Sequence, residues 1–124
     1  MAARAEVTIA VSIDGLGNGA EVKDTSQDTT APDTLIHIPE MTQETADTEE
    51  ALNVGAVDTI RGIMIRAIDG DIAVDTSFVT TFSSELLIRE GQSQFFVPTG
   101  TVYIKNNTAL ETVKFEYIVF GTQS

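Results

Sequence analysis

A glycine-rich stretch follows the first apolar run of the chain and has the spacing of a phosphate-binding loop. Gly15, Gly17 and Ala20 fit the pattern G-x-G-x-x-G/A, in which the backbone approaches a pyrophosphate at the start of a helix. The residues after Ala20, E-V-K-D-T-S over 21–26, lack the apolar spacing of a helix. The pattern therefore predicts a hairpin-like turn between two strands and no bound nucleotide.

His37 is the only histidine, and the chain has no cysteine. A zinc site of the usual kind needs several such ligands, although carboxylates can assist. A Ser-His-Asp triad would have to use His37, and no G-x-S-x-G turn presents a serine nucleophile. Because His37 stands in the apolar run L-I-H-I of residues 35–38, we expect a partly buried strand histidine.

Three aspartates near residue 70 are the remaining candidates for a cation site: Asp69, Asp71 and Asp75. Calcium takes six to eight oxygen ligands, and its looped motif D-x-[DN]-x-[DN]-G is not matched here. An acidic β-turn is the preferred interpretation. The sequence thus predicts no catalytic residue, no cofactor and no enzymatic activity.

Charge limits the partners of the chain. Its 124 residues include 7 Lys and Arg against 19 Asp and Glu, for a net charge of −12. Such a surface repels phosphate backbones and anionic lipid, so we expect neither nucleic acid nor membrane as a partner. No apolar stretch is long enough to predict a membrane-spanning helix, and no signal peptide is indicated.

Alternation of apolar and polar residues dominates the chain and predicts strands rather than helices. The predicted strands cover residues 6–13, 34–38, 59–68, 71–75, 85–89, 94–97, 101–105 and 112–120. Pro39 closes the second strand, and apolar residues on both faces near position 120 indicate that the last strand is covered on both sides there. Residues 47–52 could start a short helix, but a strand or loop is favoured.

Turn residues such as Asp69-Gly70 and Glu90-Gly91 separate these strands. Short strands joined by such turns favour an all-β fold, an antiparallel β-sandwich of jelly-roll type, with residues 1–124 as one domain. The polar segment 24–33 has little to bury and is either a long exposed loop or an edge strand. Together with residues 1–5 it could form an arm that lies on a neighbouring subunit.

Candidate interface residues come from two sources, the polar segment and the aromatic residues. Adjacent Phe95 and Phe96 point to opposite faces of a strand, so one of them could face a partner; the alternative is that both are buried. Aromatic residues are enriched at the centres of interfaces. The candidates are Phe78, Phe95 and Phe96, together with the acidic residues Asp24, Asp28 and Asp33.

The second half of the chain resembles a family of small virion structural proteins of tailed bacteriophages. Four motifs carry the resemblance: E-E-A-L-N-V-G at 49–55, R-E-G-Q at 89–92, P-T-G-T-V-Y at 98–103 and E-Y at 116–117. The N-terminal half matches only by its opening strand and S-I-D-G at 12–15. These motifs are turns and strands, and the resemblance implies no catalytic residues.

The resemblance implies a non-enzymatic β-sandwich that is made in the host cytoplasm and assembled into the phage particle. The first expectation is a capsid decoration, or cement, subunit that stabilises the capsid surface. Its partners would be copies of itself, with a trimer as one option, and a major capsid or other virion protein. The alternatives are a tail or head–tail component, such as an adaptor or fibre protein, and a carbohydrate-binding module that uses Tyr103 or Tyr117.

Overall fold

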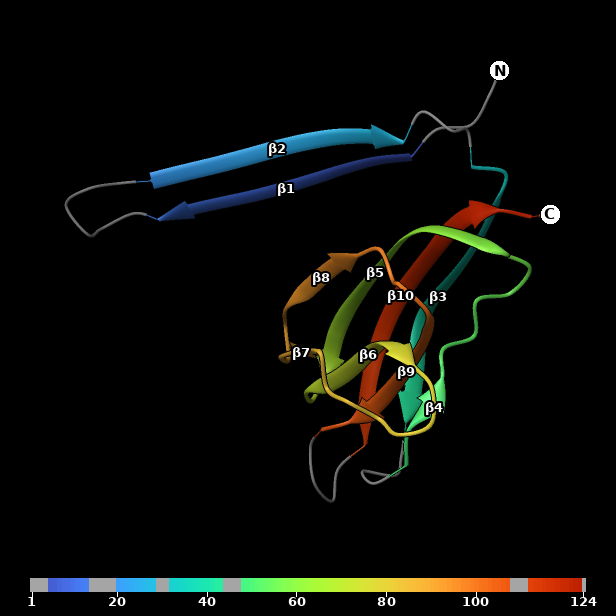
Figure 1. Ribbon diagram of the computed structural model, residues 1–124. Coiled ribbons are helices and arrows are strands. Elements are labelled where there is room, and N and C mark those ends of the chain that lie inside the picture. Colours follow the sequence, from blue (N-terminus) through green and yellow to red (C-terminus); the bar gives the residue numbers. More distant parts are fainter. Residues whose placement is uncertain (1–4, 14–19, 29–31, 44–47, 108–111, 124) are drawn as a thin grey trace. The chain divides into compact units, whose positions relative to one another are not determined.

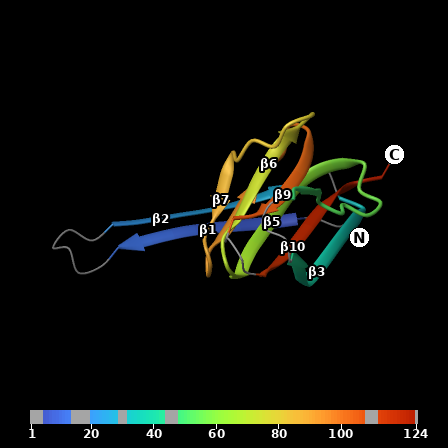
Figure 2. The same ribbon diagram turned by 90° about the horizontal axis from the view of Figure 1, so that it is seen from below.

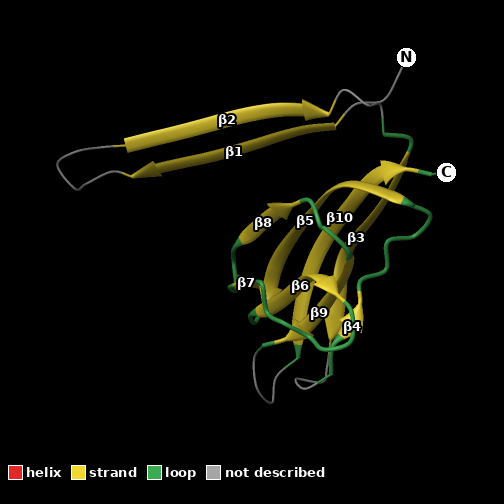
Figure 3. Cartoon of the chain, in the orientation of Figure 1, coloured by secondary structure: helices red, strands yellow, loops and turns green. Residues whose placement is uncertain are grey.

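The computed structural model describes residues 5–13, 20–28, 32–43, 48–107 and 112–123. All regular structure in these ranges is β-strand (Figures 1 and 3), which confirms the all-β prediction. None of the described segments is a helix that could span a membrane. The chain divides into two compact units, residues 1–33 and 34–124.

The first unit is built on one long hairpin. Strand β1 (Ala5–Ile13) pairs with β2 (Ala20–Asp28) in an antiparallel register without a shift, from Ala5 opposite Asp28 to Ile13 opposite Ala20. Ala20 therefore begins a strand and not the helix that a nucleotide-binding loop requires. The predicted turn at residues 14–19 lies outside the described residues. Within the polar segment, residues 24–28 are strand, as one of the two alternatives predicted.

The second unit holds two antiparallel sheets of four strands each (Figure 2). The first sheet has the order β3-β10-β5-β8 and the second has the order β4-β9-β6-β7. This arrangement confirms the β-sandwich, while the jelly-roll type stays a prediction. The strands are β3 (Thr34–Gln43), β4 (Glu50–Ala51), β5 (Thr59–Asp69), β6 (Ile72–Phe78), β7 (Leu86–Ile88), β8 (Ser93–Phe96), β9 (Thr101–Asn106) and β10 (Val113–Thr122).

The core lies between these two sheets and follows the alternation of the strands. In β10 every second side chain from Val113 to Val119 is buried, and Phe115 and Tyr117 have no exposed surface. Buried residues of β5, β6 and β9 complete the same cluster, among them Ile63, Val74 and Ile104. Because successive strand residues point to opposite faces, the polar or partly buried residues of β10 lie on the outer side.

Pro39 does not end β3, so the predicted boundary at Ile38 is wrong. The strand continues to Gln43 because β3 is an edge strand with a single neighbour, β10. The register with β10 shifts between Phe115 and Tyr117, opposite the position of the proline. A proline has no N–H to donate, and edge strands and register shifts are where a sheet tolerates one.

The short strand β4 confirms that residues 50–51 do not start a helix. The turns predicted at Asp69-Gly70 and Glu90-Gly91 are also present. Gly70 has φ 79° and Gly91 has φ 83°, a backbone region that side chains other than glycine rarely adopt.

Gly121 is required in β10 by a close approach of the backbone. A Cβ atom at position 121 would overlap the carbonyl oxygen of Thr59 and lie 2.9 Å from Cγ1 of Val57. The neighbouring backbone is paired with β10, since Asp58 donates its N–H to the carbonyl of Thr122. The β5 backbone cannot move aside without breaking the pairing of the two central strands.

We predict that Gly121→Ala destabilises the sandwich by about 2–3 kcal/mol, because overpacking against backbone forces strands apart. Urea unfolding followed by circular dichroism measures this change. Thr122→Ala, one residue further along the same strand, is the matched control and should cost less than about 1 kcal/mol. An unfolding midpoint of Gly121→Ala equal to that of the unmodified chain would contradict the close approach.

Candidate functional site

The outer side of the sheet β3-β10-β5-β8 carries an apolar patch. Its residues alternate with side chains that pack inward, and we call them the outer-face patch: Leu35 on β3, Ile118 and Phe120 on β10, Met64 on β5 and Phe95 on β8. Leu35 is 65% exposed, and the other four are partly buried. Contiguous apolar surface on the outside of a sheet is a common mark of a contact with another molecule.

Gly62 shapes this patch. The rings of Phe95 and Phe120 are stacked, with centroids 6.4 Å apart and an angle of 18° between their planes. A Cβ atom at position 62 would lie 2.6–2.8 Å from atoms of both rings. The two rings therefore occupy the space above the glycine backbone, and a side chain at position 62 would displace them.

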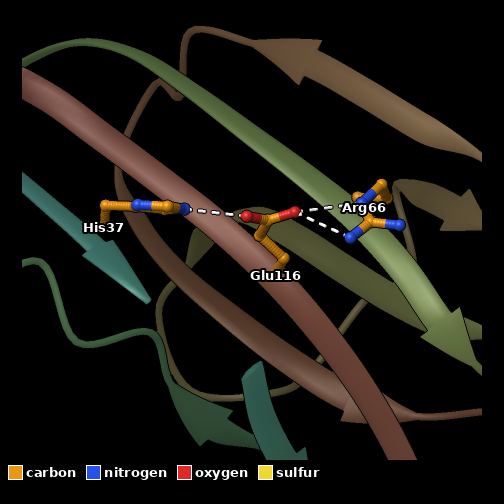
Figure 4. Close-up of polar contacts among 3 residues, drawn as sticks. All are labelled: His37, Arg66 and Glu116. Carbon is orange, nitrogen blue, oxygen red and sulfur yellow. Dashed lines mark hydrogen bonds and ion pairs between the residues drawn. The ribbon is translucent and has the colours of Figure 1, made fainter. Parts of the chain in front are cut away.

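A polar cluster borders the patch on the same side of the sheet (Figure 4). Glu116 on β10 stands directly opposite Arg66 on β5. Its Oε1 accepts a hydrogen bond from Nε at 3.0 Å and forms an ion pair with a terminal guanidinium nitrogen at 2.9 Å. Oε2 of the same carboxylate lies 2.8 Å from Nε2 of His37 on β3. Since a carboxylate only accepts hydrogen bonds, Nε2 carries the proton.

These contacts hold the pKa of Glu116 below its ordinary value of 4.5. The hydrogen bond from His37 is the largest cause and the hydrogen bond from Arg66 is the next. Both partners favour the charged form of the carboxylate. The cluster thus ties three neighbouring strands together through one acidic side chain.

His37 is not the partly buried residue that its apolar neighbours suggested. Its side chain is 46% exposed, because Ile36 and Ile38 are the positions of β3 that pack against the core. The apolar run alternates around the histidine, so the histidine points outward. Its role in the structure is to bind Glu116.

The outer face carries two ion pairs although the whole chain is strongly acidic. Beside the cluster, Nζ of Lys114 lies 3.7 Å from Oε1 of Glu40. Two carboxylates on this face, those of Glu40 and Glu116, are thus matched by Lys114 and Arg66. Over the whole chain the net charge is −12. This face can approach another acidic surface with little repulsion.

The outer side of the second sheet, unlike that of the first, is covered by a segment of the chain, the residues between Ser77 and Ser83. Asp75 on β6 is only 2% exposed. Its carboxylate accepts the backbone N–H of Ser77 and of Ser83, each at 2.9 Å, and so holds the segment between these residues across the sheet. Nearby, Nζ of Lys105 lies 5.9 Å from the centre of the Phe82 ring.

The three candidate cation ligands do not form one site. Asp75 is committed to two backbone N–H groups, and Oδ1 of Asp71 accepts the N–H of Glu90 at 3.0 Å. Asp69 is exposed at the end of β5. Within the described ranges, no group of three or more His, Cys, Asp or Glu side chains could hold a metal ion.

The aromatic candidates divide as the alternation of β8 requires. Phe95 lies on the outer-face patch, whereas Phe96 packs against the core. Phe78 stacks on Tyr103 with ring centroids 3.7 Å apart and is partly buried. Of these candidates, Phe95 is therefore the one placed on the outer-face patch.

The acidic candidates lie on or beside the hairpin. Asp24 is opposite Ile9 and Asp28 is opposite Ala5 in the β1–β2 register, but their side chains are outside the description. Asp33 is exposed just before β3.

Sequence reasoning missed most of the outer-face patch. Leu35, Met64 and Ile118 were assigned to strands, yet the face to which each points follows from register with strands far away in the sequence. The apolar second face near residue 120 was the one available signal, and it marks Ile118 and Phe120. Comparison with protein-family models, curated protein sequences and solved structures found no match to this chain.

We predict that a carboxyl NMR titration gives Glu116 a pKa below 4.5 and that His37→Ala raises it toward 4.5. Leu35→Ala, which changes the same face without touching the carboxylate, should leave the pKa unchanged. The cluster stabilises the fold above pH 4.5, and this stabilisation is lost as the pH falls through the lowered pKa. A Glu116 pKa at or above 4.5 in the unmodified chain would contradict this geometry.

We predict that Asp75→Ala destabilises the sandwich by about 1–3 kcal/mol at neutral pH, because two N–H groups lose a buried acceptor. The hydrogen bond from Ser83 is the main reason that the pKa of Asp75 lies below its ordinary value of 3.8. The carboxylate therefore stabilises the fold above pH 3.8, and the difference between variant and parent should shrink in more acidic solution.

Urea unfolding at several pH values measures this difference. Asp71→Ala removes an acceptor for one N–H at a more exposed position and is the control, with a smaller loss expected. Equal stability of Asp75→Ala and the parent chain at neutral pH would contradict a structural role for this carboxylate.

Proposed function

We propose that this chain is a non-enzymatic structural protein of a bacteriophage virion. In this proposal it is a capsid decoration subunit that binds the capsid surface and stabilises the particle. The sequence motifs that resemble phage virion proteins support the proposal. The β-sandwich, with a core closed between two sheets, is compatible with it, since a decoration subunit needs a rigid body with exposed contact surfaces.

The hairpin of β1 and β2 is the observation that carries the proposal. It is a unit of two strands with nine residues each. An isolated two-stranded sheet is marginally stable in water and becomes stable by packing on another surface. Ile9, in the middle of β1, is 54% exposed within the structure. A hairpin of this kind is suited to lie on a neighbouring subunit.

Net charge fits the same role. A chain with a net charge of −12 stays soluble at high concentration and does not adhere to the packaged genome. Its contacts must then come from specific apolar surfaces rather than from general electrostatic attraction. Val7 and Ile9 on the hairpin provide such a surface, since they share one face of β1.

The carbohydrate-binding alternative gains no support from the tyrosines. Tyr117 is buried in the core, and its hydroxyl donates to the carbonyl of Asn53 at 2.8 Å. Tyr103 is partly buried, and Phe78 covers one face of its ring. A tail or head–tail component would have the same fold, so location in the particle distinguishes it from a decoration subunit.

We predict that the purified full-length chain binds capsids that lack it and that cryo-electron microscopy shows added density over the capsid surface. Ile9→Asp should weaken binding at least about 10-fold, because an isoleucine buried in a contact contributes about 1.5–3 kcal/mol. Ala10→Asp places the same charge on the opposite face of β1 and is the matched control, with little effect expected.

Co-sedimentation with empty capsids measures the affinities of the three proteins. Density restricted to the tail would replace the decoration subunit with the tail alternative. Failure to bind any part of the particle would overturn the proposal as a whole.

A further inference from the structure

We propose that the outer face of the sheet β3-β10-β5-β8 is a two-fold interface between two copies of this chain. The copies would meet face to face, with the two-fold axis parallel to the strands and passing between β10 and β5. This inference rests on the surface of the sandwich alone and holds whatever the location of the protein in a particle.

The order of the strands makes the face complementary to itself. A two-fold axis along the strands exchanges β10 with β5 and β3 with β8, since these are the inner and outer pairs of the sheet. In a two-fold interface, a residue i of the first copy that contacts residue j of the second copy implies the reciprocal contact of j with i. Each pair of residues therefore occurs twice in the interface. The residues in each row across the sheet can therefore be matched by register.

The apolar row matches at both edges of the sheet. Leu35 on β3 is opposite Phe120, and Phe120 is opposite Gly62. At the other edge of the same row stands Val97, directly after Phe96, which pairs with Ile63. The two-fold axis brings Leu35 against Val97 of the second copy. These side chains are 65% and 57% exposed, so both gain from being covered.

The central rows match in the same way. Ile118 is opposite Met64 in the register of β10 and β5, so each meets the other residue type in the second copy. One row further along, Glu116 is opposite Arg66. The axis therefore places Glu116 of one copy over Arg66 of the other, twice. The contact is apolar at its centre and has complementary charges beside it.

Charge argues for a second copy as the occupant rather than for a basic or acidic partner. The ion pairs of Glu116 with Arg66 and of Glu40 with Lys114 neutralise two carboxylates on this face, and Asp69 lies opposite Lys114 in the register, whereas the whole chain carries −12. Two copies repel each other least where their facing charges cancel. A basic partner would bind the acidic remainder of the surface better than this face. An acidic partner would find no excess of positive charge here.

The size of the face sets the expected strength. Four strands spaced about 4.8 Å apart and about 20 Å long present roughly 400 Å² per copy when measured flat. Stable interfaces bury about 800 Å² per partner. We therefore expect a dissociation constant in the micromolar range or weaker.

Cross-linking between engineered cysteines tests the pairing directly, because the chain has no cysteine of its own. We expect Leu35→Cys mixed with Val97→Cys to form a covalent heterodimer on mild oxidation, at least about 10-fold faster than either variant forms a homodimer. Within one chain the two positions lie about 14 Å apart, at opposite edges of the sheet, which is too far for a disulfide.

Val79→Cys is the matched control for the cross-linking experiment. Val79 is 82% exposed but follows β6 in the other sheet. Mixed with Leu35→Cys, it should cross-link no faster than random collision allows. Equal rates for the Val97 and Val79 partners would overturn the proposed pairing.

A charge exchange tests the central contact. Arg66→Glu and Glu116→Arg should each be monomeric alone in sedimentation velocity, since like charges face each other in both homodimers. An equimolar mixture should sediment as a dimer, because each variant then meets the opposite charge. These side chains are 49% and 21% exposed, and each change also removes the ion pair within one chain. Circular dichroism and urea unfolding therefore check that both variants are folded before their sedimentation is compared.

Two outcomes would overturn the inference. One is an unmodified chain that remains monomeric at millimolar concentration, and the other is a mixture of charge variants that remains monomeric. If the chain is monomeric and the cysteine of Leu35→Cys also reacts slowly with a maleimide, that cysteine is shielded from solvent. Another segment of the chain or another protein then covers the face in place of a second copy. Loss of the dimer would leave capsid binding through the hairpin unaffected, so the two proposals fail separately.

Discussion

Alternation along β10 is the constraint on which the sandwich depends. This strand lies between β3 and β5, and its inward residues, including Phe115 and Tyr117, are fully buried. A slip of one residue would exchange Phe115 for Glu116 in the core and expose the aromatic rings. Gly121 and the register shift beside it let β10 stay paired with β5, and a second shift between Phe115 and Tyr117 accommodates β3. Every residue of the outer face takes its position from this register.

The two sheets of the sandwich meet the surroundings in different ways. On the second sheet, the buried carboxylate of Asp75 binds the segment that crosses the outer side, so Ala73 and Asp75 are both covered. On the first sheet, the rings of Phe95 and Phe120 pack over Gly62, and Leu35 remains largely exposed. Exposing apolar side chains to water costs free energy, so contiguous apolar surface commonly marks a contact with another molecule. The outer face, with its apolar patch beside the ion-paired Glu116, is therefore the best candidate for such a contact.

The hairpin and the outer face are the two surfaces on which the proposed contacts rest. Several acidic side chains of the sandwich bind groups of the chain itself: Asp75 and Asp71 accept backbone N–H groups, and Glu85 accepts the Ser77 hydroxyl. Glu116 illustrates the point, since its hydrogen bonds join β3, β10 and β5. Its carboxylate fixes the positions of His37 and Arg66 on the outer face. The carboxylate of Asp75 likewise organises a turn.

The alternation of apolar residues was enough to predict most of the strands, the all-β sandwich and the turns at Gly70 and Gly91, because side-chain direction and backbone conformation are local properties. It did not predict β2, whose residues are mostly polar, or the second half of β3. Pro39 shows the limit: its effect depended on β3 being an edge strand, which is a property of the sheet and not of the segment. His37 and Glu116 are 79 residues apart, and their contact depends on a long-range register that no local pattern encodes. The sequence by itself thus determined which segments are strands and which of their faces are apolar. Only the tertiary structure decided which faces meet in the core and which are left for a partner, because strand order is set by pairing between distant segments.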